Sequence, residues 1–391
     1  MTARTAPTNL AKPIIAYISW DSFYGRSKAA DVHTSQLAQA LLRHDYEVNV
    51  IMSGQNTMHF TAGYHSIIAE TPDITGNPLT KFVSLIRKNW RLYNQTLKYS
   101  RDAQILYERH NSGSVVGLAL SLRLHKPLYY ELNTITAAEA LIMHGVRNRF
   151  VYVALDLLVA IELRRAKAVI VQTEELKEIV EGRYRIHNVY VVPNGTEAHE
   201  GSRRRPRKRN EVIKATYLGT VDAYHDIDKI LAMFANLEHI AELRVVGDGP
   251  ELAKLKKKYE GAGIEFYGVV PHDEVFTVMG DSDIGIAAYN TQSELFRKYG
   301  FYFCPLKLLE YAAFGMPTVF VGWRNSFVSE FERAGACVVV EGSDGLREVI
   351  RQFIDCPSRL LAMSEAASAM ARKYSWDEAA RKTAAVFEER S

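Results

Sequence analysis

The sequence predicts an α/β protein with two doubly wound domains that face each other across a cleft. Apolar strand-like runs alternate with helical segments along the whole chain, a pattern typical of parallel sheets covered by helices. The pattern starts afresh near residue 211, after a polar and strongly basic stretch at 201–210. A length of 391 residues also favours more than one domain. We expect an N-terminal domain at 1–200, a linker at 201–210 and a second domain at 211–375, followed by a C-terminal helix at 376–391.

The strands of the two halves can be placed from their apolar runs. The first half opens with a strand at 14–19, a loop through Gly25 and a helix at about 31–44. The remaining strands of the first half are expected at 47–52, 105–107, 128–132, 168–172 and 189–192. Those of the second half are expected at 213–218, 243–246, 264–267, 284–288, 318–321 and 337–340. Ligands of such sheets bind beyond the carboxyl ends of the strands, so the cleft is the expected site.

Composition indicates an ordinary soluble protein. Hydrophobic residues make up 47% of the chain and charged residues 24%, and a net charge of +3 gives no strong bias toward nucleic acid. Cys304, Cys337 and Cys356 show neither paired spacing nor a metal-ligand pattern, which favours reduced thiols in the cytoplasm. The N-terminus lacks the apolar core of a signal peptide. The most apolar run, at 150–161, is shorter than the ~18 residues of a membrane span and contains Asp156, so we expect a buried helix.

The segment 303–319 is the most informative part of the chain. Pro305 stands where a helix would begin, apolar residues follow at helical spacing, and Gly315 closes the helix before a buried strand. The free N–H groups at such a helix start can bind an anion, and the carboxylate of Glu310 can accept hydrogen bonds from a ribose. Taken alone, the segment is equally compatible with an ordinary amphipathic helix that exposes its glutamate.

An ordered set of segments resembles the retaining glycosyltransferases of family 4, which have the GT-B fold of two Rossmann-like domains. The second half carries Tyr217-Leu-Gly-Thr220, Val245-Val-Gly-Asp-Gly-Pro-Glu-Leu252, Phe266-Tyr-Gly-Val-Val-Pro271 and the segment 303–319. In the first half, Val192-Pro-Asn-Gly195 and the stretch from Gly25 to His33 are similar to the family's domain exit and first loop. The resemblance covers roughly residues 13–388.

The resemblance implies donor-site roles in the second half. Glu310 matches the glutamate that binds the ribose hydroxyls. The backbone of Cys304, Pro305 and Leu306 matches the loop that donates to the donor sugar and distal phosphate, and Gly268 to Val270 match the strand end that holds the base.

In the first half, Asn133 stands where many relatives have a histidine that touches the donor sugar. Glu131 and Glu139 are nearby acidic candidates, with surface or capping carboxylates as the alternative. Arg109 and His110 follow another strand and would also point at the cleft, although such a pair can equally stabilise a loop.

Departures from the family pattern mark the chain as a variant with Pro-Leu-Lys before Glu310. Tyr302 replaces a glutamate that binds sugar hydroxyls in many relatives. Thr220, directly after Gly219, and His225 replace an arginine and a lysine that neutralise the diphosphate. Because the departing diphosphate needs a cation, we expect Lys307 to supply it, whereas the alternative is a solvated helix lysine. Arg297 and Lys298 are second choices.

The implied chemistry is retaining transfer from a nucleotide-diphosphate sugar to a hydroxyl of a saccharide, lipid-linked or small-molecule acceptor. The acceptor would attack from the face on which the nucleotide departs and lose its proton to the leaving phosphate. We expect no cofactor and no metal site, because Asp281-Ser-Asp283 has the spacing of a metal motif but aligns with a structural position. A UDP-sugar is the expected donor, since uridine is the commonest donor base of the family.

Two other functions stay open. A sugar-nucleotide epimerase or hydrolase of the same fold would need acid and base groups, for which Glu131, His110 and Asp21 are candidates. A non-catalytic nucleotide-sugar-binding relative would be consistent with Tyr302 and the missing arginine.

Basic residues suggest a peripheral contact with an anionic membrane on its inner, cytoplasmic face. The stretch Arg203 to Arg209 carries six cations in seven residues, and the expected helix at 81–101 combines apolar and basic side chains. Each cation near an anionic surface contributes ~1 kcal/mol. The alternative is a surface helix whose apolar side packs on the first sheet. The resemblance also implies that the C-terminal helix at 376–391 returns to the first domain, with Trp376 anchoring its start.

Overall fold

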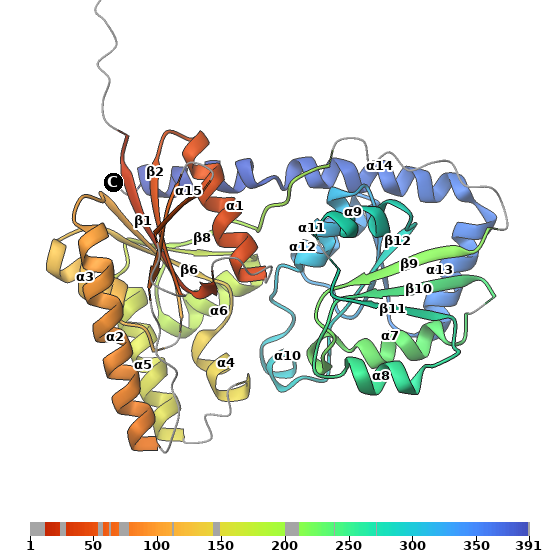
Figure 1. The fold of residues 1–391 in the computed structure, drawn as a ribbon, viewed down its shortest axis with the longest axis horizontal. Helices are drawn as coiled ribbons and strands as arrows, with labels where there is room; N and C mark the ends of the chain where they lie inside the picture. Colours follow the sequence, from red (N-terminus) through yellow and green to blue (C-terminus); the bar gives the residue numbers. More distant parts are fainter. Residues whose placement is uncertain are drawn as a thin grey trace, which may run out of the picture. The chain divides into compact units, whose positions relative to one another are not determined.

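The chain forms two compact units, each with its own sheet. The computed structural model describes residues 12–23, 29–53, 58–61, 64–69, 78–111, 113–143, 149–199, 211–237, 239–270 and 272–389. Unit 1 comprises Met1–Val171, Val180–Val192 and Ala379–Ser391, and unit 2 comprises Gln172–Ile179 and Pro193–Glu378. Figure 1 shows a mainly parallel sheet with helices on both faces in each unit. The predicted class of two doubly wound α/β domains is confirmed. The expected linker at 201–210 and Gly25 lie outside the described residues.

The described strands of unit 1 form one sheet in the order β3-β4-β2-β1-β5-β6-β7-β8. The strands are β1 (Ile14–Phe23), β2 (Glu47–Ser53), β3 (Met58–Thr61), β4 (Tyr64–Ala69), β5 (Ile105–Arg109), β6 (Leu128–Leu132), β7 (Ala168–Val171) and β8 (Val189–Val191). Neighbouring strands are parallel except β3, which runs antiparallel to β4. Every strand expected in this half is present, and β3 and β4 are additional.

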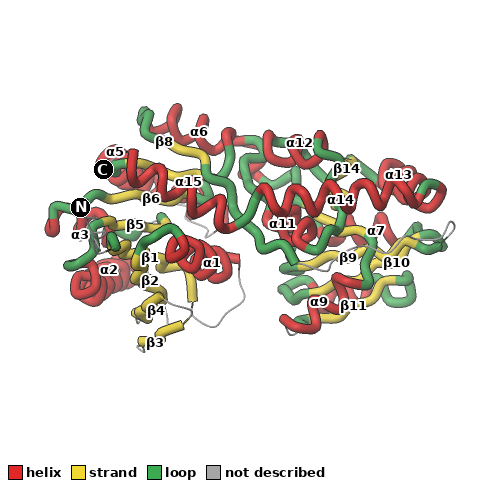
Figure 2. Tube along the Cα trace, turned by 90° about the horizontal axis from the view of Figure 1, so that it is seen from above, coloured by secondary structure: helices red, strands yellow, loops and turns green. Residues whose placement is uncertain are grey.

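Helices cover both faces of this sheet. They are α1 (Ala29–Arg43), α2 (Pro78–Ser100), α3 (Val116–Leu124), α4 (Thr136–Met143), α5 (Arg149–Arg165), α6 (Glu174–Tyr184), which is shared between the units, and the C-terminal α15 (Trp376–Glu389). In Figure 2, α1 and α15 lie on one face of the sheet, and α2 and α3 lie on the other. Phe387 of α15 packs against Tyr107 and Tyr129, so the end of the chain belongs to the core of unit 1.

The expectation of a buried helix at 150–161 is wrong. Helix α5 exposes Phe150 by 86% and Leu157 by 60%, whereas Val159 and Leu163 face inward. Asp156 pairs with Arg183 of α6 at 2.8 Å. The apolar character of this stretch therefore reflects two apolar faces, of which only one is covered by the described residues.

The described strands of unit 2 form an entirely parallel sheet in the order β11-β10-β9-β12-β13-β14. The strands are β9 (Ile213–Leu218), β10 (Ala241–Val246), β11 (Ile264–Gly268), β12 (Ile284–Ala288), β13 (Thr318–Val321) and β14 (Cys337–Val340). The helices are η1 (Ala223–His225), α7 (Ile227–Phe234), α8 (Leu252–Lys258), α9 (His272–Gly280), α10 (Glu294–Tyr299), α11 (Leu306–Ala313), α12 (Ser326–Arg333), α13 (Ser343–Asp355) and α14 (Pro357–Lys373). All six strands expected in this half are present.

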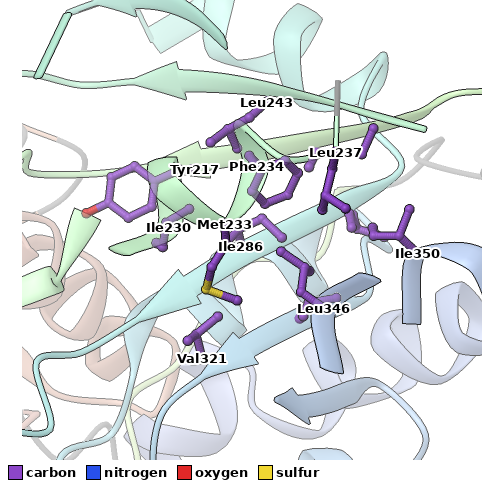
Figure 3. Packing of buried hydrophobic residues seen from close by; sticks show 14 of the residues in the cluster. Tyr217, Ile230, Met233, Phe234, Leu237, Leu243, Ile286, Val321, Leu346 and Ile350 are labelled. Carbon is purple, nitrogen blue, oxygen red and sulfur yellow. The ribbon is translucent and has the colours of Figure 1, made fainter. Parts of the chain in front are cut away.

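The core of unit 2 fixes the ends of these strands. Tyr217 of β9, Leu243 of β10 and Ile286 of β12 pack with Phe234 of α7 and Ile350 of α13 (Figure 3). On the other side of the sheet, α11 packs against β12 and α14. The carboxyl ends of β9 and β10 and the start of α11 are thereby held by buried apolar contacts.

Candidate active site

Helix α11 starts where the sequence predicts a helix that could bind a phosphate. Pro305 precedes the helix with φ −68°, and Lys307, Leu308 and Leu309 of the first turn are buried. Side chains hold the incoming loop, because Thr173 Oγ1 donates to the carbonyl of Tyr302 at 2.6 Å and Asn325 Nδ2 donates to that of Phe303 at 2.7 Å. The loop that presents the first turn is therefore fixed by the fold of unit 2.

Lys307 is buried without a carboxylate partner. The residue is 7% exposed, and no ion pair joins its Nζ to a carboxylate in the described part of unit 2. Nζ lies 5.3 Å from the centre of the Tyr217 ring. Burial lowers the pKa of Lys307, while the fields of Glu310 and Asp222 act in the opposite direction. Lys307 is therefore not the solvated helix lysine of the alternative interpretation, and a buried charge without a partner is costly.

The end of strand β9 makes room for this lysine. A Cβ on Gly219 would stand 2.6 Å from Lys307 Nζ, and φ of Gly219 is +137°. On the neighbouring strand, a Cβ on Gly247 would lie 2.0 Å from the carbonyl oxygen of Gly219. The N–H of Gly247 in turn donates to the carbonyl of Gly268 at the end of β11. Backbone alone can thus line the carboxyl edge of three adjacent strands.

A histidine–aspartate pair lies beside Lys307. Nδ1 of His225 is 2.8 Å from Oδ1 of Asp222, whose oxygen also accepts the backbone N–H of His225 at 3.0 Å. Burial and the charge of Lys307 lower the pKa of His225, against the effect of Asp222. Thr220 is exposed, and its carbonyl accepts the hydroxyl of Tyr217 at 2.6 Å.

Glu310 lies one turn deeper in α11 than Lys307. Its side chain is half-buried, and burial raises its pKa while the charge of Lys307 opposes the rise. Cys304 keeps its proton at neutral pH, because burial raises the pKa of the thiol to about 12. Tyr302, in the position of the missing glutamate, is fully buried and stacks on Phe303. Tyr302 is therefore a core residue, and no carboxylate that could bind sugar hydroxyls stands at this position.

In unit 1, the carboxyl edge of the sheet holds a cluster around Glu131. The carboxylate is 1% exposed and accepts the hydroxyl of Tyr107 at 2.6 Å and the amide of Asn133 at 3.0 Å. His33 Nε2 lies 2.8 Å away and Arg109 lies 3.5 Å away. Burial would raise the pKa of Glu131, but His33, Arg109 and the hydrogen bond from Tyr107 hold it well below its usual value. Glu131 therefore fixes the orientation of Asn133 and Arg109.

His110 belongs to a different cluster from Arg109. Alternation along the strand turns the two side chains to opposite faces of the sheet. Nε2 of His110 lies 3.1 Å from Glu162 of α5, and its ring meets that of Tyr130 edge-on. The structure thus does not join His110 to the cluster around Glu131.

The structure brings several of the predicted residues together. The structure brings Gly219, His225 and Glu310 close to Lys307 at the start of α11. It also brings Glu131 and Asn133 together at the edge of the unit 1 sheet, but it shows no contact between Thr220 and α11. Asp222 and His33 were missed by sequence analysis because their roles depend on partners that only the fold reveals. Asp222 lies three residues before His225, a spacing that could have suggested the pair.

The described residues contain neither a cluster of metal ligands nor a helix that could span a membrane. No group of three or more histidine, cysteine, aspartate or glutamate side chains is placed to hold a metal ion. No described helix combines the length and apolar character needed to cross a bilayer.

Comparisons with known proteins agree with this architecture. Residues 30–200 match the model of Glycosyltransferase Family 4, and residues 213–356 match that of Glycosyl transferases group 1. No curated protein sequence matches the chain.

Several solved structures share the fold over nearly the whole chain. Sucrose-phosphate synthase from Thermosynechococcus elongatus is similar with a TM-score of 0.74 at 14% identity, covering 97% of this chain and 99% of that one. Anabaena HepE in complex with UDP-glucose has a TM-score of 0.65 at 14% identity, covering 96% and 99%. The lipopolysaccharide outer core galactosyltransferase WaaB has a TM-score of 0.65 at 11% identity, covering 97% and 100%. At such identities the likeness shows the fold alone.

Proposed function

Because the chain belongs to the family 4 glycosyltransferases, we propose that it transfers a sugar from a nucleotide-diphosphate sugar to an acceptor hydroxyl, with retention at the sugar carbon and without a metal ion or other cofactor. The observation that carries the proposal is the buried ammonium of Lys307, which has no carboxylate partner among the described residues and lies against Gly219 at the start of α11. In this arrangement the diphosphate lies at the helix N-terminus, next to Lys307. Glu310, one turn further, accepts hydrogen bonds from the ribose.

The donor site divides its contacts between side chains and backbone. The backbone N–H groups of Cys304 and Leu306 face the distal phosphate and sugar. Pro305, which lies between them, has no N–H group. The strand end from Gly268 to Val270 holds the base, which we propose to be uracil. HepE, whose fold is similar, was crystallised with UDP-glucose.

The reaction needs no nucleophile from the protein. The bond between the sugar carbon and the diphosphate oxygen breaks while the acceptor oxygen attacks from the same face. The acceptor proton passes to the leaving phosphate. Lys307 and the helix dipole stabilise the charge that develops on the diphosphate.

Asn133 of unit 1 is the proposed amide contact to the donor sugar. Its orientation is set by Glu131, which acts as a positioning residue because its carboxylate is buried and fully engaged. His110 is likewise buried and paired with Glu162. These surroundings support transfer rather than epimerisation, which would need an accessible acid and base.

Replacing Lys307 by methionine tests the proposal. Met keeps the length and removes the charge, so we expect kcat to fall by about 10²–10³-fold, with the affinity for UDP also reduced. Lys256 of α8 is exposed in the same unit, and Lys256→Met should leave both values unchanged. The readout is release of UDP from UDP-sugars with and without acceptor hydroxyls. Unchanged turnover in Lys307→Met would remove the proposed role.

Product analysis separates the alternative functions. Release of nucleotide that depends on an acceptor supports transfer. An isomerised donor sugar would support the epimerase, and tight donor binding without turnover would support a non-catalytic relative.

We also propose that unit 1 contacts an anionic membrane, as suits a lipid-linked acceptor. Helix α2 contains no acidic residue and exposes Val83, Ile86 and Trp90, the last by 66%. These residues recur at helical spacing, and Arg87 and Arg91 are exposed on neighbouring positions. Leu92, by contrast, is buried, so α2 has an inner apolar face and an outer one that is apolar and basic. Such a face suits the headgroup boundary of a bilayer.

The exposed apolar face of α5 supports the same proposal. Val153, Leu157 and Ile161 form one stripe of α5, and each is exposed by 45–60%. Figure 1 shows α2 and α5 extending past the strands of unit 1 in the same direction.

Co-sedimentation with vesicles tests the membrane contact. Vesicles of phosphatidylglycerol should pellet the protein at low salt, and those of phosphatidylcholine should not. Trp90→Asp should reduce pelleting several-fold. Trp323→Asp in unit 2, which replaces another partly exposed tryptophan, serves as the control. Equal pelleting of both variants would exclude α2 as the contact.

A further inference from the structure

The neighbourhood of Lys307 contains more titratable groups than a fixed cation site needs. His225, Asp222 and Glu310 act electrostatically with Lys307, and the ring of Tyr289 lies 5.4 Å from that of His225. Tyr289 stays protonated at neutral pH, since burial and the nearby Glu310 raise its pKa well above the usual value. With His225 neutral, one cation faces two carboxylates. This balance is unfavourable for a ligand that carries two or more negative charges.

The hydrogen bond to Asp222 determines what His225 can offer a ligand. An ionised Asp222 accepts the proton on Nδ1 at 2.8 Å, so the neutral ring carries its proton there and has a lone pair at Nε2. Within the described part of the chain, Nε2 has no hydrogen-bond partner. A lone pair repels phosphate oxygens, whereas a protonated Nε2 would donate to them.

Burial and Lys307 keep His225 neutral while the site is empty. A bound diphosphate would make the local field much more negative, because it adds two or more negative charges beside Lys307. The same histidine would then gain a proton and become the second cation of the site.

We propose that binding of the nucleotide diphosphate is coupled to the uptake of one proton at Nε2 of His225, and that Asp222 is the positioning residue that makes this uptake possible. The inference rests on the proposed donor site. It makes donor affinity depend on pH and makes the second cation available only while the diphosphate is present.

Isothermal titration calorimetry with UDP measures the uptake directly. Titrations at pH 7.5 in two buffers of different ionisation enthalpy give the number of protons taken up per UDP. The terminal phosphate of UDP, with a second pKa of about 6, is ionised at this pH and adds little. We expect close to one proton for the unmodified protein, and an affinity that falls up to tenfold per pH unit between pH 7 and 8.5.

Substitutions distinguish proton coupling from a structural effect. His225→Gln can keep the hydrogen bond to Asp222 and should bind UDP more weakly at pH 7, without proton uptake. His239→Gln, at an exposed position of unit 2, should behave as the unmodified protein. Asp222→Asn should reduce the uptake at pH 7.5 but leave UDP affinity at pH 8.5 equal or tighter, because a negative charge is removed. A merely structural role for Asp222 would weaken binding at every pH.

The outcomes separate this inference from the donor site itself. If UDP binds and Lys307→Met weakens it, but no proton is taken up, only the coupling is overturned. Retention of the uptake in His225→Gln overturns its assignment to His225. Failure of UDP, GDP and ADP all to bind would overturn the donor site and the coupling together. As a second measurement, the NMR titration of the His225 ring should show it protonated at pH 7.5 with UDP and neutral without it.

Discussion

Two buried charges in this protein have opposite surroundings. Five side chains either donate a hydrogen bond to Glu131 or lie within ion-pair distance of it: Tyr17, His33, Tyr107, Arg109 and Asn133. Lys307 meets an aromatic ring and a glycine but no paired carboxylate among the described residues. A satisfied buried charge can serve the fold, whereas an unsatisfied one costs stability. The cost at Lys307 is understandable if a ligand supplies the missing anion.

At the scale of single residues, the substitution Gly219→Ala tests whether the space beside Lys307 is needed for activity. The new Cβ would stand 2.6 Å from Nζ and would force a left-handed backbone on alanine. We expect kcat to fall at least tenfold, together with a loss of about 1–3 kcal/mol in stability. Measurement of kcat and of urea unfolding gives both numbers.

Gly261→Ala is the matched control for that substitution. Gly261 also has a positive φ, +79°, but nothing lies within 4 Å of the Cβ it would gain. Its loss of stability should be similar and its kcat unchanged. If Gly219→Ala were as active as Gly261→Ala, the contact with Lys307 would have no catalytic importance.

At the scale of elements, the spacing of apolar residues and the composition predicted most strands of the two sheets. They also predicted the part of the candidate site that lies on one short segment of the chain. The strands at 284–288 and 318–321 are buried along their whole length because both faces of the sheet are covered by helices. Lys307 and Glu310 could be found because they share one short helix with Pro305. Strands β3 and β4 gave no such signal. The outer face of α5 was misjudged because apolar residues do not reveal whether anything covers them.

The buried cluster around Glu108 of β5 is another feature that the sequence does not show. Glu108 accepts the hydroxyl of Ser114 at 3.0 Å and lies near a second buried carboxylate, Glu162. Burial, and then the charge of Glu162, raise the pKa of Glu108 to about 8. Glu108 and Glu162 come close together only because α3 and α5 pack near strand β5. No local sequence pattern encodes this packing.

This cluster predicts a pH dependence of stability. An unfolded Glu108 ionises near 4.5, whereas the folded one keeps its proton up to about pH 8. Between these values the folded state binds the extra proton, so stability falls by about 1.4 kcal/mol per pH unit as pH rises. Glu108→Gln should remove this component and unfold at higher urea than the unmodified protein at pH 8.5, but not at pH 4.5. Glu47→Gln, at an exposed position of β2, should show no such difference. A parallel pH profile for Glu108→Gln would show that Glu108 is ionised in the fold.

At the scale of the whole molecule, the chain leaves unit 1, builds unit 2 and returns. Helix α15 begins at Trp376 in unit 2 and ends in unit 1, where the Phe387 ring lies 4.7 Å from Tyr129 and 5.5 Å from Tyr107. The hydroxyl of Tyr129 also donates to the carbonyl of Phe387 at 3.2 Å. Unit 1 therefore cannot complete its core until the last residues of the chain are present.

Phe387→Ala should consequently destabilise unit 1 and leave the donor site of unit 2 intact. Removing a fully buried phenylalanine costs about 3–5 kcal/mol. Hydrogen exchange should therefore become faster in peptides from β5 and β6 while those from β9 and β10 keep their protection. UDP affinity should be unchanged, because every proposed nucleotide contact belongs to unit 2. Phe387→Leu, which fills part of the space, should cause a smaller loss confined to the same peptides. Equal loss of protection in both units would mean that they unfold as one cooperative body, and the discontinuous unit 1 would then not be an independent folding unit.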